Sequence, residues 1–172
     1  MLIGHLPAGY IISRLLYPRL LSTGAPFRTF LSVGLLGSIA PDFDMLYFHF
    51  FDHRLHNHHT YWSHFPSVWL PVLVCSFVVF RIRRSALAAT ILIFTINGFA
   101  HLLLDSIVGD IAWLAPWHSS FYSLAHVPAT HAIWWMNYVL HWSFCCEIAL
   151  IVWAFWLLRK TPHASSSFQR GA

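Results

Sequence analysis

Three long apolar stretches constrain this chain more than any other feature of its sequence. They cover residues 65–82, 86–108 and 136–158. Each approaches or exceeds the roughly 17–25 residues that a helix needs to cross a bilayer. The composition agrees, because 58% of the residues are apolar and 9% are charged, whereas an average soluble domain has roughly 25% charged residues. The sequence therefore predicts an integral membrane protein.

Two shorter apolar segments precede these stretches. Residues 2–20 are interrupted by glycines, prolines and an arginine, which favours a short span or a re-entrant or interfacial helix. A second helix is expected over residues 29–40, where Pro41 follows and removes a backbone donor. The predicted fold class is all-α, an integral membrane bundle of about five helices, with three clear transmembrane spans and two shorter N-terminal helices. We expect one domain over residues 1–160 and a disordered tail over residues 161–172.

Basic residues gather at the ends of the apolar segments. They cluster within residues 19–28, 81–84 and 159–160, and the positive-inside rule assigns such clusters to the cytoplasm. Threading five helices alternately across the bilayer then places residues 42–64 and 101–136 together on the opposite side. The basic residues behind the net charge of +4 are thus interpreted as markers of membrane topology. No basic helix with interleaved aromatic residues occurs, so nucleic acid is not expected as a partner.

A polar island follows the second predicted helix. Asp42 and Asp44 flank Phe43 directly after Pro41, and two carboxylates at this spacing point the same way if the backbone is extended. A histidine-rich segment comes next, in which not all imidazoles can be ligands: His56, His58, His59 and His64. The alternative for the carboxylates is a solvated loop, and for any one histidine it is interface polarity, which we accept for His49, His53 and His163.

A second polar island lies within the predicted span 86–108. His101 and Asp105 are four residues apart, so they share one face of a helix. Ionisable groups within a span are costly, which makes the pair a candidate functional site, although a His–Asp hydrogen bond that fixes helix packing is the alternative. Because the topology brings both islands to one side, we predict that they meet and bind a divalent metal. Imidazole and carboxylate without thiolate suit zinc first, with manganese or iron as alternatives.

Several of these motifs together resemble a known family. They are Gly-Ser-x-x-Pro-Asp-x-Asp at residues 37–44, His-x-x-x-Ser-His at residues 59–64 and His-x-x-x-Asp at residues 101–105, with a nearby Gly-Asp and an N-terminal His5. Over roughly residues 1–118 the chain resembles the membrane-bound metal-dependent hydrolases of bacteria and archaea, a family with distant similarity to zinc-dependent phospholipase C. The resemblance implies a hydrolytic metal centre in the bacterial inner membrane.

The resemblance also implies a set of metal ligands, namely His5, Asp42, Asp44, His59, His64, His101 and Asp105. It leaves open whether His53, His56, His58 or His59 fills the first histidine role. A bound metal would lower the pKa of water from near 16 to roughly 7, and Asp44 or Asp110 is the candidate general base. Because the predicted topology puts the site near the non-cytoplasmic bilayer surface, we expect membrane lipid as a partner and an amphiphilic phosphodiester or ester as substrate.

Two other function classes stay open. His101 and His141 could be the axial ligands of a haem, although a haem has no use for the paired carboxylates. A divalent-metal transporter would need ionisable groups along a path through the bilayer, and Glu147 is the one deep candidate. We interpret Glu147 as a hydrogen-bonded residue that stabilises helix contacts. His118, His126 and His131 lie in the outer connection, where they would add ligands or cover the site.

Overall fold

The computed structural model of the chain describes residues 3–160. Within this part all the named elements are helical, with seven α-helices and no strand, which confirms the all-α class. Three of the α-helices are long and apolar enough to cross a membrane by length and composition. The predicted tail over residues 161–172, including His163, lies outside the described residues.

The five longer α-helices account for the five predicted elements, and two short ones are added at one end of the bundle. The α-helices are α1 (His5–Leu20), α2 (Phe27–Ile39), α3 (Asp44–Phe50), α4 (Pro66–Arg83), α5 (Ala86–Asp105), α6 (Trp134–Val139) and α7 (Trp142–Arg159). Four single-turn 3₁₀ helices connect them, η1 (Leu21–Thr23), η2 (Pro41–Phe43), η3 (His58–Thr60) and η4 (Trp62–His64). The candidate spans are α4, α5 and α7.

The predicted apolar stretch 136–158 is two helices rather than one. The chain breaks at His141, whose φ of −83° and ψ of 145° are those of an extended residue, and its side chain accepts a hydrogen bond from the backbone N–H of Ser143. His141 therefore caps α7, because a side-chain acceptor satisfies one of the free donors at a helix start. Residues 136–158 contain no proline or glycine, so no residue of the stretch signalled this break.

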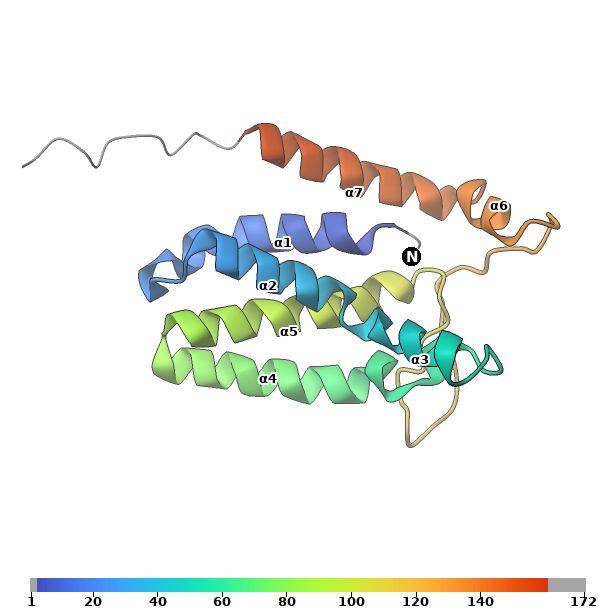
Figure 1. Cartoon of the computed structure of the whole chain (residues 1–172), viewed down its shortest axis with the longest axis horizontal. Helices are drawn as coiled ribbons and strands as arrows, with labels where there is room; N and C mark the ends of the chain where they lie inside the picture. The colour runs from blue at the N-terminus through green and yellow to red at the C-terminus, as the bar shows by residue number, and fades with distance from the viewer. Residues whose placement is uncertain (1–2, 161–172) are drawn as a thin grey trace, which may run out of the picture.

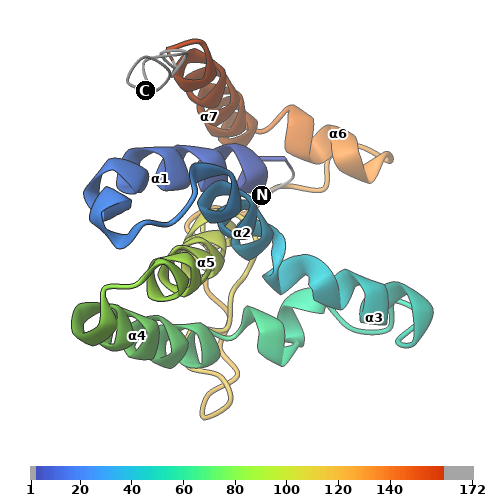
Figure 2. The same cartoon turned by 60° about the vertical axis from the view of Figure 1, so that its left-hand side comes forward.

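Helix α5 is the centre of the bundle. It packs against α1, α2 and α4, while α7 lies against α1, as the two views in Figures 1 and 2 show. Half of the apolar span of α5 is buried within the protein, against 17% for α4 and α7. Helices α4 and α7 therefore leave more of their apolar surface outside the bundle than α5 does.

Two glycines let neighbouring helices approach α5 closely. A Cβ atom on Gly37 of α2 would overlap the backbone carbonyl of Phe94, and one on Gly98 would overlap the Trp69 ring of α4. The indole Nε1–H of Trp69 in turn donates to the carbonyl of Ser63 at 2.7 Å. The close packing of α4 on α5 thus fixes the backbone that precedes His64.

The basic clusters and the polar islands lie at opposite ends of the bundle. The α1–α2 connection, the α4–α5 connection and the end of α7 gather at one end in Figure 1, and α3 with the long connection after α5 lies at the other. This is the arrangement that the alternate threading of five helices predicts. The orientation of the bundle across a membrane stays a prediction.

Candidate metal centre

Four ionisable side chains converge where η2, η4 and α5 meet. Asp42, His64, His101 and Asp105 each place one ligand atom within 4.8 Å of the others. The Nε2 atom of His101 lies 2.9 Å from Oδ2 of Asp105 and 3.4 Å from Oδ1 of Asp42. The Nε2 atom of His64 lies 3.9 Å and 3.6 Å from the same two oxygens. Two imidazole nitrogens and two carboxylate oxygens therefore face a common centre, as predicted for the two polar islands.

The opposite nitrogen of each histidine has an acceptor of its own. Nδ1 of His101 donates to the carbonyl of Ser38 at 2.8 Å, and Nδ1 of His64 donates to Oδ2 of Asp44 at 2.6 Å. A carbonyl or carboxylate oxygen can only accept, so Nδ1 carries a proton in each ring, and in the neutral form of either ring Nε2 keeps its lone pair. Metal-binding histidines are almost always held in this way. The same Nε2 atoms make no other hydrogen bond within residues 3–160.

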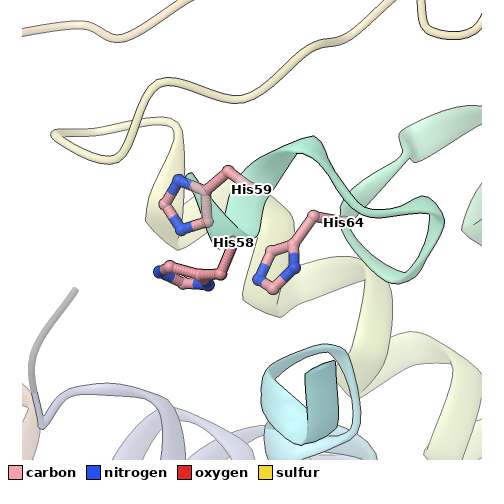
Figure 3. Close-up of side chains that lie close together, drawn as sticks. All are labelled: His58, His59 and His64. Atoms are coloured by element: carbon pink, nitrogen blue, oxygen red, sulfur yellow. The ribbon is translucent and has the colours of Figure 1, made fainter. Parts of the chain in front are cut away.

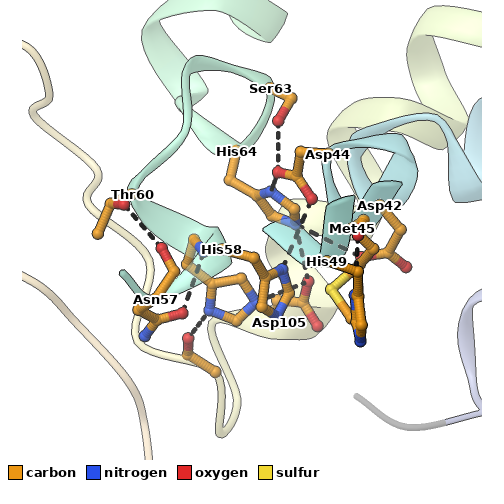
Figure 4. A network of polar contacts seen from close by, with 12 residues as sticks. Asp42, Asp44, Met45, His49, Asn57, His58, Thr60, Ser63, His64 and Asp105 are labelled. Atoms are coloured by element: carbon orange, nitrogen blue, oxygen red, sulfur yellow. Dashed lines mark hydrogen bonds and ion pairs between the residues drawn. The ribbon is translucent and has the colours of Figure 1, made fainter. Parts of the chain in front are cut away.

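Asp42 and Asp44 contact different nitrogens of His64. The chain runs through η2 directly into α3, so the backbone between them is helical and not extended, and their side chains diverge. Asp42 lies at the Nε2 side of His64, whereas Asp44 binds the Nδ1 side and also accepts a hydrogen bond from Ser63 at 2.5 Å. Figure 4 shows this network. Asp44 orients His64, and its predicted role as a direct ligand stays a prediction.

His5 completes the other side of Asp105. Its Nε2 atom lies 3.1 Å from Oδ1 of Asp105, and its ring stacks on that of His101 with centroids 3.7 Å apart. The segment before His5 is tied to α7, because the N–H of Ile3 donates to Oε2 of Glu147 at 2.5 Å. Glu147 is buried and holds the segment that leads into α1 against α7, which agrees with its interpretation as a hydrogen-bonded residue that stabilises packing.

The structure distinguishes the four histidines that the sequence left open. His59 is buried, its Nδ1 donates to the carbonyl of Gly109, and its Nε2 lies 3.8 Å from Oδ2 of Asp105. His58 lies beside it and, with His59 and His64, forms a second group of ligand atoms within 4.8 Å of one another, shown in Figure 3. His53 and His56 are exposed. Of the four histidines, His59 therefore lies at the metal centre beside Asp105, and His58 lies next to His59.

The remaining candidates lie elsewhere. Asp110 accepts a hydrogen bond from Ser123 and lies 3.7 Å from Nδ1 of His126, so its contacts are with the connection after α5. His118 and His131 are exposed in that same connection. The roles of Asp44 and Asp110 as general base stay predictions.

The pKa shifts of the carboxylates and the histidines of the cluster differ in direction. Burial raises the pKa of Asp42, but its contacts with His101 and His64 outweigh burial and hold the pKa well below its usual range. Burial likewise opposes ionisation of Asp44, whose contacts with His58 and His64 lower its pKa to about 2. Burial lowers the pKa of His59 to about 3. At neutral pH both carboxylates are therefore ionised and His59 is neutral, which are the forms that bind metal. Burial lowers the pKa of His64, but its contacts with Asp42 and Asp44 outweigh burial and raise it, so a metal at its Nε2 atom would displace a proton.

An open pocket of about 280 Å³ leads to the cluster. Its polar lining residues are Asp42, Asp105, His58 and His59, and its other lining residues include Met45, Val108, Trp134 and Tyr138. Sequence reasoning missed Met45 and Tyr138 as site residues, because neither carries a ligand group and Tyr138 comes from α6, more than thirty residues after Asp105 in the chain.

Comparisons of the chain with protein-family models, with curated proteins and with solved structures find no match. The resemblance to the membrane-bound metal-dependent hydrolases therefore stays a prediction from the motifs. What the geometry gives is a buried His/Asp cluster that could hold a metal ion, in a helical protein with three candidate membrane spans.

Proposed function

We propose that this protein is a membrane-embedded metal-dependent hydrolase. The observation that carries the proposal is the convergence of two imidazole Nε2 atoms and two carboxylates from separate parts of the chain. Asp42, His64, His101 and Asp105 would hold the ion, with His5 and His59 at the edges of Asp105. Nitrogen and oxygen donors without thiolate suit zinc first, then manganese or iron.

Four protein donors would leave water a place only as a further ligand, and the opening beside Asp42 is the feature that favours catalysis over a purely structural role. Structural zinc sites are closed by four protein ligands, commonly including thiolates, whereas catalytic sites keep a position open for water or substrate. Here the side chain of Asp42 is 36% exposed, and the pocket of about 280 Å³ opens beside it. A divalent ion at this place would acidify a bound water and polarise a phosphoryl or acyl group.

The pocket supports an amphiphilic substrate. Its lining combines the ionisable groups of the cluster with Met45, Val108, Trp134 and Tyr138, and the cluster sits at the end of a bundle in which three helices are long and apolar enough to cross a membrane. A lipid-like phosphodiester or ester carries both a polar bond and an apolar chain, which match the two kinds of lining residue. Localisation in a bacterial inner membrane, with the site on the non-cytoplasmic face, is part of the same proposal.

The haem and transporter alternatives have weaker support. His141 caps α7 through Ser143, while Nε2 of His101 faces two carboxylates, so neither histidine is disposed as an axial ligand. The clustered groups lie at one end of the bundle, and Glu147 bonds Ile3 near that same end. The described residues therefore offer no chain of ionisable groups through the bundle.

The proposal is tested by hydrolysis assays on the purified full chain. Phosphodiester and carboxylic-ester lipids are presented in mixed micelles, with the protein either stripped of metal or reloaded with zinc or manganese. We expect metal-dependent hydrolysis of at least one class, and its loss in His101→Ala. His53→Ala, an exposed histidine outside the cluster, is the control that keeps activity. Hydrolysis that survives both metal removal and His101→Ala, or none with any substrate class, would count against the proposal.

A further inference from the structure

The metal centre has more ligand groups than one ion uses. The ion of the proposed function is held by four side chains, Asp42, His64, His101 and Asp105. His58 and His59 lie beside them and, with His64, form the second group of ligand atoms within 4.8 Å of one another (Figure 3). Because Nε2 of His64 already faces the first ion, the two further histidines need an explanation of their own.

His59 presents a ring nitrogen to the centre in the same way as the first ligands do. Its Nδ1 atom donates to the carbonyl of Gly109, so in the neutral ring Nε2 keeps its lone pair. That Nε2 atom lies 3.8 Å from Oδ2 of Asp105. Two ligands of one zinc ion are about 3.4 Å apart when the site is tetrahedral and each ligand is about 2.1 Å from the metal. A small shift of either side chain would therefore place both on a common ion.

His58 supplies a second imidazole next to His59. The centroids of the two rings are 4.1 Å apart. The side chain of Asn57 accepts a hydrogen bond from the backbone N–H of His59, which caps the single turn η3 that carries both histidines. Nδ1 of His58 is buried, makes no hydrogen bond within the described residues and lies 3.7 Å from Oδ1 of Asp44. An ion bound at Nε2 of His58 would strengthen the attraction between an Nδ1 proton and this carboxylate.

Asp105 is the ligand that two ions could share. Its Oδ2 atom lies 2.9 Å from Nε2 of His101 on one side and 3.8 Å from Nε2 of His59 on the other. The open pocket of about 280 Å³ is lined by His58, His59 and Asp105, and none of its lining residues is lysine or arginine. In hydrolytic sites with two metals the ions are roughly 3.5–4 Å apart, a separation that one shared oxygen can span.

We propose that the centre binds a second divalent ion, held by His58, His59 and Asp105, with water from the pocket as its remaining ligands. The inference rests on the proposed function, because the first ion shares Asp105. Two adjacent ions stabilise both the attacking and the leaving oxygen of an in-line displacement. The second ion therefore favours phosphodiesters over carboxylic esters as the substrate class.

The alternative is that His58 and His59 only hold the loop before α4 against the connection after α5, through the contact of His59 with Gly109. The two accounts differ in the number of ions that the protein binds. A loop contact leaves one ion per chain, whereas the proposed ligands give two.

The test is the zinc content of the full chain, which is stripped of metal, equilibrated with excess zinc and freed of unbound ions. We expect two zinc ions per chain, and one in the double variant His58→Gln/His59→Gln. His53→Gln/His56→Gln is the matched control, because both histidines are exposed in the same loop, and it should keep two ions. One ion in the unaltered chain would overturn the second site and leave the proposed function in place, whereas none would overturn both. Two ions in His58→Gln/His59→Gln would refute the assigned ligands.

A second measurement uses the unaltered chain and so needs no variant to fold. The metal-free protein is loaded with manganese, and its electron paramagnetic resonance spectrum is recorded. Two manganese ions that share Asp105 should give the multiline spectrum of an exchange-coupled pair. The six-line spectrum of an isolated manganese ion at full loading would contradict the proposal.

Discussion

At the scale of single residues, the side chains that would bind the metal differ from those that orient them. Asp42 and Asp105 face the Nε2 atoms of His64 and His101, whereas Asp44 holds the Nδ1 proton of His64 at 2.6 Å. An outer carboxylate of this kind fixes the tautomer and strengthens the imidazole as a donor. Its loss should weaken metal binding without abolishing it.

Asp44→Asn tests that distinction. We expect zinc affinity to fall by about 10–100-fold, because the amide cannot supply the negative charge that supports His64. Asp110→Asn is the matched control, since Asp110 bonds Ser123 away from the cluster. Competition titrations against a metal-binding dye measure both variants. Equal affinities in Asp44→Asn and the unaltered chain would show that Asp44 does not support the ligand, and complete loss would show that it binds the metal directly.

The residues of the site differ in how far the sequence could place them. His101 and Asp105 share a helix face whatever the tertiary structure, so their spacing in the sequence was enough to predict that they act together. The relative orientation of Asp42 and Asp44 depends on whether the backbone after Pro41 is extended or helical. The local sequence does not decide between these two conformations. The choice of His59 depends on the carbonyl of Gly109, 50 residues away, and no local pattern could indicate that contact.

At the scale of helices, close packing against α5 holds the two halves of the centre together. Gly37 of α2 lies where a Cβ atom would overlap the carbonyl of Phe94, and the next residue, Ser38, supplies the acceptor for His101. A change in the spacing of α2 and α5 would therefore alter both stability and the orientation of His101.

Gly37→Ala should destabilise the protein by about 1–3 kcal/mol, the usual cost of overpacking a well-packed interior. Thermal unfolding in detergent, followed by circular dichroism, measures the change. Ser32→Ala lies on the same helix at an exposed position and should leave the midpoint unchanged. An unaltered midpoint for Gly37→Ala would mean that α2 and α5 do not pack as closely as described.

The observed helix boundaries agree with the predicted ones where a proline or a cluster of charged residues marks the boundary. Pro66 begins α4 and Arg83 ends it, close to the predicted stretch 65–82. The break at His141 was missed because the residues on both sides are apolar and the cap is a histidine side chain. Apolar length alone does not distinguish one span from a short helix followed by a longer one.

At the scale of the whole molecule, the basic clusters and the candidate metal centre lie at opposite ends of the bundle. Basic clusters lie at one end and the polar islands at the other (Figure 1), and from this arrangement the positive-inside rule predicts that the site lies on the non-cytoplasmic side. The distribution of arginines could predict which segments share an end. It could not predict that α6 would bring Trp134 and Tyr138 to the pocket.

Cysteine accessibility tests the orientation. In a chain without its native cysteines, Ser22→Cys lies in the exposed α1–α2 connection and His53→Cys in the exposed loop at the site end. A membrane-impermeant maleimide applied to intact cells should label His53→Cys and spare Ser22→Cys. Labelling of Ser22→Cys with protection of His53→Cys would reverse the topology while leaving the metal centre in place.

The central claim is that Asp42, His64, His101 and Asp105 bind a metal ion, and elemental analysis of the purified protein tests it most directly. The full chain should carry a stoichiometric amount of a divalent transition metal, zinc first. Asp42→Ala and His101→Ala should each lose most of it, and His53→Ala should retain it. Unchanged metal content in both Asp42→Ala and His101→Ala would contradict the account.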